Sequence, residues 1–519
     1  MATYLTPGVY VEEVQSGARP IEGVGTAVAA FVGFAQSGPF HEPTLVTSWD
    51  QYTQHFGGFT EGAYLPHSVY GYFANGGGAA YVVRIGGAGA ADSAPAAPGG
   101  RPQPRAAEPV ELGGFLVAAR PGVTGVSVEI ADADGENPPE DRFKILVRQG
   151  DQVAETYEAS ARKNVKGYLV SAARASKLIE VTEQRGAAQT RPAGQTVAVP
   201  DAAAPAPAPA GQGGLARLDP AEYVGDAGAR TGFAGLETID EITMVAVPDL
   251  MSAYERGDID SEGVRTVQLA VISHCEQMGD RVAVLDSPPG LSAQQVRSWR
   301  NDEAGYDSRY AALYYPWIRV FDPASGRNAT VPPSGHIAGV WARSDAERGV
   351  HKAPANEVIR GAVDLELRLS KGEQDLLNPI GVNCVRAFPG RGIRIWGART
   401  LSSDPAWRYL NVRRLFNYLE ESILLGTQWV VFEPNDDRLW SSIRRNVTAF
   451  LTEEWRNGAL FGRTAAEAFY VKCDRDNNPQ ESIDLGRVIC EIGVSPVKPA
   501  EFVVFRLAQF SDSTSLVDE

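Results

Sequence analysis

The sequence has few of the residues that build metal and redox sites. It contains four cysteines and six histidines among 519 residues. The cysteines form no C-x-x-C pair, and the histidines form no H-x-x-x-H or H-E-x-x-H pattern, the spacings that zinc and redox sites use. We therefore predict no metal and no other cofactor, and we expect reduced, buried thiols at Cys275, Cys384, Cys473 and Cys490.

Positive charge and long apolar runs are also scarce. Lysine and arginine number 48 against 64 aspartates and glutamates, for a net charge of −16. Phosphate binding needs clustered positive charge, so this balance disfavours nucleic acid or an anionic membrane as the main partner. No run of about 18 apolar residues is present to span a bilayer. The first residues lack the basic start and apolar core of a secretory signal peptide. We expect a protein that assembles in the cytoplasm and does not insert into a membrane.

Motifs for nucleotide binding and hydrolysis are missing as well. The strand pattern R-V-A-V-L-D at 281–286 is followed by S-P-P-G, not by the G-x-G-x-x-G that cradles a pyrophosphate, and there is no G-x-x-x-x-G-K-[ST]. Ser334 and His336 lie in V-P-P-S-G-H, which is not the G-x-S-x-G elbow of a hydrolase, so we predict a structural turn. Although these motifs are missing, we keep an α/β nucleotide-binding or hydrolytic enzyme as an alternative function, because the strand and helix pattern is compatible with one.

Two acidic segments partly resemble calcium loops. Asp474 to Asn478 (D-R-D-N-N) begins like one, but Pro479 stands where glycine is required and Leu485 where a bidentate glutamate would be. The segment D-A-D-G-E at 132–136 has its glycine too early for the same loop. We interpret both as solvated turns.

Both ends of the chain have the pattern of an apolar strand. Residues 4–14 read Y-L-T-P-G-V-Y-V-E-E-V, and residues 501–510 read E-F-V-V-F-R-L-A-Q-F. A free apolar strand exposes unpaired backbone groups and invites pairing with another chain. We predict that these ends act as strand arms between protomers, carried by Tyr4, Leu5, Pro7, Gly8, Val9, Tyr10, Val11 and Glu12 at one end and Phe502, Val503, Val504, Phe505 and Leu507 at the other.

Two segments of low complexity divide the chain. Both are rich in Gly, Ala and Pro, cannot form a core and are typical of linkers. Alternating strand patterns between them predict a β-rich insertion. The predicted organisation is an N-terminal arm (1–25), a first core part (26–85), a linker (86–110), the insertion (111–185), a second linker (186–217), an α/β core region (218–330), a C-terminal domain (331–500) and a C-terminal arm (501–519).

The segment after the second linker alternates between strand and helix patterns. Strands at 243–247, 281–286 and 310–315 enclose helices at 261–278 and 292–301, which predicts an open, parallel or mixed sheet covered by helices. Further helices are predicted at 355–371, 411–425 and 437–458. The predicted fold class is therefore an α/β core with an open mixed sheet, a β-rich insertion domain and extended terminal strands.

One basic cluster stands out from the acidic total. Six arginines occur between 391 and 414 with only Asp404 opposing them. Arginine forks pair well with carboxylates, either across an interface or within one domain. The cluster therefore predicts contact with an acidic partner or a neighbouring protomer, or intradomain salt bridges, through Arg391, Arg394, Arg399, Arg408, Arg413 and Arg414.

An ordered set of motifs runs through most of the chain. It comprises P-G-V-Y-V-E-E (7–13), A-A-F-V-G-F-A-Q-S-G-P (29–39), Y-G-Y-F-A-N-G-G-G (70–78), Y-A-A-L-Y-Y-P-W (310–317), V-P-P-S-G-H-I-A-G (331–339), N-P-I-G-V-N (378–383), W-G-A-R-T-L (396–401), G-T-Q-W (426–429) and F-E-P-N (432–435). In this set the sequence resembles the contractile tail sheath proteins of phages and of phage-tail-like injection systems.

The resemblance implies a structural subunit and no catalysis. Such subunits form a helical sleeve around an inner tube, in an extended metastable state, and contract to drive the tube into a target. It implies terminal arms that add strands to sheets of adjacent protomers. The implied partners are further copies of the chain, the inner tube protein, and the baseplate and cap proteins of the same particle.

Overall fold

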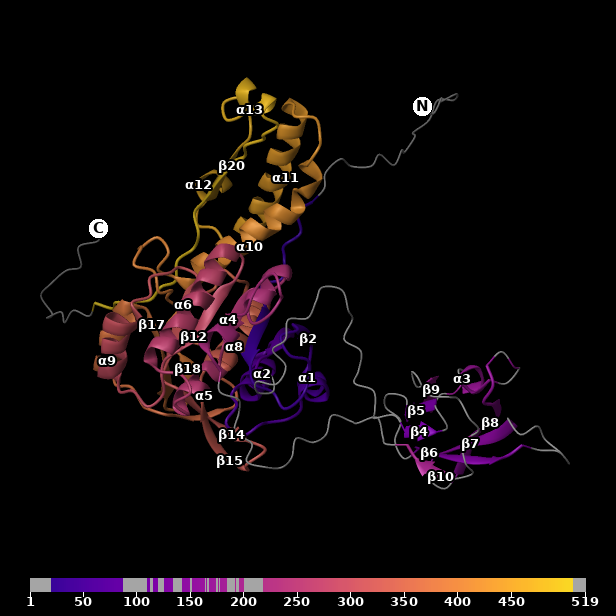
Figure 1. Ribbon diagram of the computed structural model, residues 1–519. Helices are drawn as coiled ribbons and strands as arrows, with labels where there is room; N and C mark the ends of the chain where they lie inside the picture. The colour runs from indigo at the N-terminus through magenta and orange to yellow at the C-terminus, as the bar shows by residue number, and fades with distance from the viewer. Residues whose placement is uncertain are drawn as a thin grey trace, which may run out of the picture. The chain divides into compact units, whose positions relative to one another are not determined.

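The computed structural model describes residues 20–86 and 218–506 without a gap, together with parts of the stretch between 110 and 199. The described residues fall into two compact units (Figure 1). The larger unit contains the segments on either side of 90–214, and the smaller unit lies within 90–214.

An open mixed sheet of eight strands is the centre of the larger unit as described. Its order is β18-β17-β13-β12-β11-β1-β3-β2, in which the six inner strands run parallel and the two edge strands antiparallel. Inner strands such as β12 and β13 are buried at every residue, as expected for strands covered on both faces. The predicted α/β class with an open mixed sheet is confirmed. The strand bounds are β1 (Val28–Gly33), β2 (Thr44–Val46), β3 (Ala79–Arg84), β11 (Met244–Ala246), β12 (Val282–Asp286), β13 (Ala311–Tyr315), β17 (Val382–Phe388) and β18 (Gly392–Ile395).

Helices cover both faces of this sheet. The core on one face includes α1 (Trp49–Phe56), α2 (Leu65–Asn75) and α8 (Ser334–Arg348). Helices α2 and α8 pack closely because Gly335 and Gly339 let the α8 backbone approach Ser68 and Tyr72. The core on the other face includes α4 (Pro220–Val224), α5 (Asp249–Glu255), α6 (Ser261–Met278), α7 (Ala293–Ser298) and α9 (Lys371–Leu377). A small sheet, β14 (Ile318–Asp322), β15 (Arg327–Val331) and β16 (Ala362–Leu365), contributes to the first of these cores, with α1, α2 and α8.

Residues 410–497, which we call the C-terminal lobe, have a hydrophobic core of their own. It is built mainly on α10 (Leu410–Gly426) and α11 (Asp437–Arg456), with Leu415, Val447 and Leu451 fully buried. The lobe is completed by α12 (Ala465–Ala468), β19 (Phe469–Lys472), α13 (Gln480–Asp484) and β20 (Glu491–Val494). Its helices confirm those predicted at 411–425 and 437–458.

The smaller unit contains two antiparallel sheets. One has the order β10-β6-β7-β8 and the other β4-β5-β9, and they share a core that includes Phe115, Val128 and Ile145. The bounds are β4 (Val110–Leu112), β5 (Phe115–Ala119), β6 (Val126–Asp132), β7 (Arg142–Gln149), β8 (Gln152–Ser160), α3 (Leu169–Ala172), β9 (Ile179–Glu183) and β10 (Thr196–Ala198).

Two local predictions are wrong. The helix predicted at 355–371 is mainly extended chain, because the Ile359 amide donates to the Ile393 carbonyl along β18 and Gly361 adopts a φ of +84°. Cross-strand pairing has overridden the local helical pattern there. The turn predicted at Ser334 and His336 is the first turn of α8, where both side chains are buried.

Candidate assembly site at the roots of the terminal segments

Two segments lead from the predicted arms into the folded body. We call residues 20–28 the N-terminal root and residues 497–501 the C-terminal root. The predicted arm residues 4–12 and Leu507 lie outside the described residues. The structure therefore shows how the chain is held at the two roots, which lie next to the predicted arms.

The N-terminal root runs antiparallel to α10 in the C-terminal lobe. Ile21 is buried in the lobe core. The Val24 amide donates to Ser422 Oγ at 3.1 Å. A Cβ atom on Gly23 would collide with the Tyr418 hydroxyl, so only glycine allows this close approach. The root therefore connects the lobe to the central sheet, which it enters as β1.

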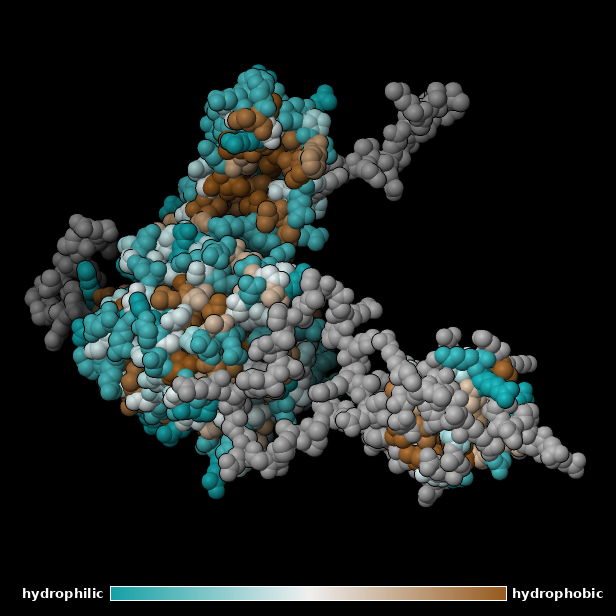
Figure 2. Space-filling model, in the orientation of Figure 1, coloured by the Kyte–Doolittle hydropathy of each residue, from teal (hydrophilic) through white to brown (hydrophobic). Residues whose placement is uncertain are grey.

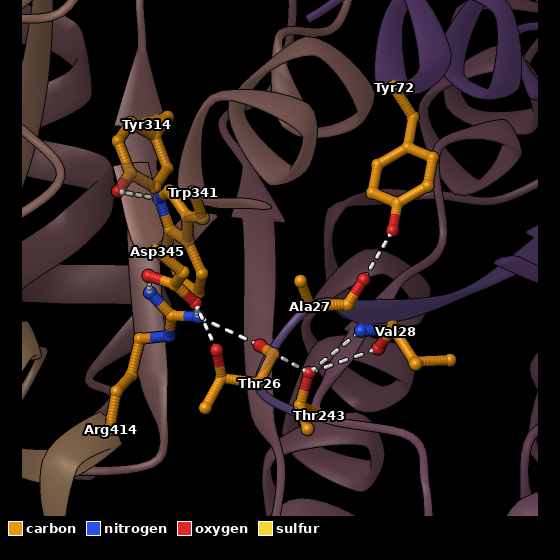
Figure 3. A network of polar contacts seen from close by, with 9 residues as sticks. All are labelled: Thr26, Ala27, Val28, Tyr72, Thr243, Tyr314, Trp341, Asp345 and Arg414. Carbon is orange, nitrogen blue, oxygen red and sulfur yellow. Dashed lines mark hydrogen bonds and ion pairs between the residues drawn. The ribbon is translucent and has the colours of Figure 1, made fainter. Parts of the chain in front are cut away.

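A buried ion pair fixes the sheet end of this root (Figure 3). The Arg414 guanidinium of α10 donates to both carboxylate oxygens of Asp345 on α8, at 2.9 and 2.5 Å, and to the Thr26 carbonyl at 3.0 Å. The Thr26 hydroxyl donates to Asp345 at 2.7 Å. The Arg414 and Asp345 side chains are only 3% and 4% exposed. Trp341 lies beneath the guanidinium, 4.8 Å from ring centre to Cζ, and adds a cation–π contact.

Further hydrogen bonds from neighbouring elements hold the root backbone at residues 26–28. The Thr243 hydroxyl donates to the Thr26 carbonyl at 2.8 Å and accepts from the Val28 amide at 3.2 Å. The Tyr72 hydroxyl, on α2, donates to the Ala27 carbonyl at 2.6 Å. In Figure 3 these side chains converge on Thr26, Ala27 and Val28 from separate elements. Because a buried bidentate pair and its hydrogen bonds act together, loss of one partner would leave an uncompensated buried charge.

A second ion pair fixes the C-terminal root. The Glu501 carboxylate accepts from Arg399 at 2.9 and 2.6 Å, from the Asn378 amide at 2.7 Å and from the Tyr409 hydroxyl at 3.2 Å. Upstream, the Asn411 side chain donates to the Val497 carbonyl at 3.1 Å. The Arg399 and Glu501 side chains are 10% and 19% exposed, so this pair is closer to solvent than the first.

The ionised form of Glu501 is favoured by its partners. Partial burial works against the charge, but hydrogen bonds from Arg399 and Asn378 and the Arg399 charge outweigh it and lower the pKa of Glu501 below its ordinary value of 4.5. The C-terminal root is therefore held by charge at neutral pH.

The C-terminal root lines a groove of about 870 Å³. Basic and aromatic side chains form much of the wall, including Lys352, Arg386, Phe388 and Trp396. Phe502 and Val503, immediately after Glu501, also line this groove. The four apolar residues that follow Glu501 are 74%, 69%, 78% and 85% exposed, and none is in a strand: Phe502, Val503, Val504 and Phe505.

The arginine cluster divides between the two roots and the surface. Arg414 and Arg399 hold the roots. Arg413 is buried against Tyr310 and Trp407 and reaches Glu420 at 3.0 Å. Arg391 and Arg408 are exposed. Arg394 donates to the Asn356 carbonyl at 2.6 Å, and Arg391 to its side-chain oxygen at 3.1 Å. Arg399, Arg413 and Arg414 each form an ion pair within the chain, and contact of the cluster with an acidic partner or a neighbouring protomer stays a prediction.

The C-terminal lobe carries an open apolar face (Figure 2). Strands β19 and β20 pair with each other as a two-stranded sheet, and neither has a second strand partner among the described residues. Phe461 and Tyr470 are 72% and 60% exposed. The partly buried apolar residues beside the lobe core include Val471, Ile483, Val488, Ile492 and Val494.

Within the described part of the chain, no group of three or more His, Cys, Asp or Glu residues could hold a metal. None of the helices described there is long and apolar enough to cross a bilayer. At the carboxyl end of β12, where an α/β sheet often binds ligand, Asp286 accepts from the Ser334 amide at 2.9 Å and is buried at the N-terminus of α8.

Comparisons with known proteins agree on one family. Residues 228–401 match the phage tail sheath protein central domain, and residues 402–510 match the phage tail sheath C-terminal domain. The chain is similar to the tail sheath protein of Burkholderia phage BcepMu, with 25% identity over 97% of both chains. It is also similar to the tail sheath protein of Vibrio phage KVP40, with 27% identity over 56% of this chain and 46% of that one. The chain thus spans less than half of the KVP40 protein.

A solved structure gives the same fold. The helical sheath of the anti-feeding prophage in its contracted state matches 98% of this chain and all of the other, with a TM-score of 0.58 and 24% identity. This likeness extends over the central sheet and the C-terminal lobe alike.

Proposed function

Since the chain belongs to the phage tail sheath protein family, with matched domains that together run from 228 to 510, we propose that it is the sheath subunit of a contractile injection particle. The subunit polymerises helically around an inner tube and contracts from an extended, metastable state to drive the tube into a target. The observation that carries this proposal is the family match over both sheath domains. Family membership favours this structural role over the nucleotide-binding or hydrolytic alternative.

The two terminal arms are the proposed links between protomers. An arm of about 12 extended residues reaches roughly 40 Å at about 3.3 Å per residue, enough to cross to a neighbour. Strand addition would supply affinity through backbone hydrogen bonds. The exposed Phe502 to Phe505 segment, which follows a firmly held Glu501, supports this role for the C-terminal arm.

The two-stranded sheet of the C-terminal lobe is the proposed acceptor for such arms. Strands β19 and β20 each have an edge without a described partner, and apolar side chains lie beside them. Added strands would cover these apolar residues and satisfy the edge backbone groups. The lobe also holds the N-terminal root, so an incoming arm and an outgoing arm would meet on the same lobe.

Contraction is proposed to be a change of packing between folded bodies without covalent chemistry. The arms would act as tethers while the bodies rotate. The extended state would persist because of a kinetic barrier and contacts with the tube. The buried Arg414–Asp345 pair supports this proposal, because it attaches the N-terminal root to helices α8 and α10.

The proposed partners are further copies of the chain, the inner tube, and the baseplate and cap proteins, with no nucleic acid and no inserted membrane segment. Assembly is proposed to take place in the bacterial cytoplasm. Of the arginine cluster, Arg391 and Arg408 are the exposed members that could meet an acidic tube or neighbour.

Negative-stain microscopy of the purified or co-expressed full chain tests the function. Tubular sleeves or stacked rings are the expected result. Discrete small oligomers whose stability depends on an added nucleotide would instead support the enzyme alternative.

A further inference from the structure

Two cysteines of the C-terminal lobe face each other at the end of its two-stranded sheet. The antiparallel register pairs Phe469 with Val494 and Lys472 with Glu491. One step further along the same register, Cys473 lies opposite Cys490. The two thiols lie close enough for each to shift the pKa of the other. Cysteines 17 positions apart in sequence are thus brought together by the fold.

The position of this pair in the ladder suits a disulfide. The Ser495 amide donates to the Ala468 carbonyl, so positions 468 and 495 are a hydrogen-bonded pair. Such pairs alternate with non-hydrogen-bonded ones along the ladder, and five steps further on, Cys473 and Cys490 fall in the second class. Cα atoms in that class are about 4.5 Å apart, within the range of roughly 4.4–6.8 Å that disulfides use.

The connection between the two cysteines is held in place by Asn478. Its side chain donates to the Ile489 carbonyl at 2.9 Å and accepts from the Ile489 amide at 2.6 Å. Asn478 is itself buried, and its amide group also donates to the Asp474 carbonyl at 3.1 Å. The residues flanking both cysteines are therefore fixed, so bond formation would need little backbone movement.

We propose that Cys473 and Cys490 form an oxidative modification site at which a reversible disulfide closes the base of the β19–β20 hairpin. The other two cysteines are different in kind: Cys275 and Cys384 are each fully buried in the core of the central sheet. Nothing in this proposal depends on the sheath function, because it concerns chemistry within one lobe.

The reaction is a thiol–disulfide exchange with a low-molecular-weight disulfide such as oxidised glutathione. Cys490 is the more exposed of the pair. One cysteine of the pair, as its thiolate, attacks the oxidant, forms a mixed disulfide and releases one glutathione thiol. The thiolate of the other cysteine then attacks the sulfur of the first, forms the protein disulfide and releases the second glutathione thiol. The hydrogen bond from Cys490 and the nearby Arg444 charge outweigh burial and lower the pKa of Cys473, which favours the thiolate in the reduced pair.

Closure would stabilise the lobe. The bond encloses a loop of 16 residues, 474–489, and a cross-link of this size removes conformational freedom from the unfolded chain. We expect the lobe to unfold several degrees higher after oxidation and to return to its original midpoint after reduction. The sheet that we propose as arm acceptor would then be stiffer in the oxidised particle.

Peptide mapping of the full chain tests the proposal. The protein is incubated with oxidised glutathione, its remaining thiols are alkylated under denaturing conditions, and tryptic peptides are analysed without reduction. The expected result is a linked pair of peptides, 473–475 with 488–506, that separates on reduction, while Cys275 and Cys384 are alkylated. Alkylation of all four cysteines, a lasting glutathione adduct on Cys490, or a link between two chains would each overturn the proposal.

A matched variant separates the disulfide from a general effect of oxidation. Cys490→Ser keeps a small side chain at a partly exposed position and should show neither the linked peptides nor the reversible rise in unfolding temperature. A rise of the same size in this variant would contradict the proposal, even if the linked peptides were found in the unaltered chain.

Discussion

Each root is held to the folded chain by an arginine–carboxylate ion pair, but the two pairs differ in how deeply they are buried. At the N-terminal root the Arg414–Asp345 pair is 3% and 4% exposed, and the Thr243 and Tyr72 hydroxyls add hydrogen bonds to the same root. At the C-terminal root the Arg399–Glu501 pair is 10% and 19% exposed and lines an open groove. Both pairs use an arginine from the same cluster in the sequence.

Because of this difference in burial, we expect the N-terminal root to stay attached whatever the solvent conditions and the attachment of the C-terminal root to depend on them. A buried bidentate pair cannot be exchanged for water without leaving a charge unpaired, so the N-terminal root should stay attached whenever the body is folded. The C-terminal root lies nearer to solvent and depends on the charge of one carboxylate. The N-terminal arm is therefore expected to be the stronger tether.

The largest effect on folding is expected from breaking the buried pair. Asp345→Ala leaves the Arg414 charge without its partner between α8 and α10 and should lower the free energy of unfolding by about 3–5 kcal/mol. Chemical denaturation followed by circular dichroism measures this loss. Arg408→Ala, at an exposed position of the same cluster, is the matched control and should change stability by less than about 0.5 kcal/mol. Equal losses in the two variants would remove the distinction between buried and surface arginines.

A smaller effect is expected at the second root. Glu501→Gln keeps the shape of the side chain but removes its charge, and the partly exposed pair should couple by about 1 kcal/mol or less. A double-mutant cycle with Arg399→Gln isolates that coupling. If Glu501→Gln destabilised the chain as much as Asp345→Ala, the two roots would be fastened equally firmly.

The attachment of the C-terminal root should depend on pH. The folded pKa of Glu501 lies below its unfolded value, so the stability it contributes is present above about pH 4.5 and is lost as the pH falls through the lower, folded value. Release of the segment should change the fluorescence of Trp396, which lines the same groove. The difference titration between the native chain and Glu501→Gln measures this step. If the difference between the native chain and Glu501→Gln did not change with pH, the charge of Glu501 would not be what holds the root.

The smallest effect on stability is expected from the exposed arginines. Charge reversal by Arg391→Glu and Arg408→Glu should leave the unfolding midpoint nearly unchanged, because neither side chain is buried. If these residues meet an acidic tube, the double variant should co-sediment less with tube protein, and more so at low salt. Unaltered co-sedimentation at every salt concentration would remove them from the proposed tube contact.

Periodicity predicted strands β11, β12 and β13 of the central sheet and helices α6, α10 and α11, because their burial follows from local strand and helix patterns. The helix at 355–371 failed because pairing with β18 decides that segment. Charge counting found Arg399 and Arg414 but not their partners. Asp345 and Glu501 are 69 and 102 positions away and show no local signal. Thr26 and Thr243 at the N-terminal root were missed for the same reason, since only the fold brings them together.

Whether the terminal arms serve assembly and not folding is most directly tested by deleting residues 1–14. The deletion leaves the N-terminal root and its Arg414–Asp345 fastening in place. Electron microscopy of this variant beside the full chain, with circular dichroism and thermal unfolding as folding controls, should show discrete folded protomers in place of sleeves. Sleeves of normal length from the shortened chain would contradict the account.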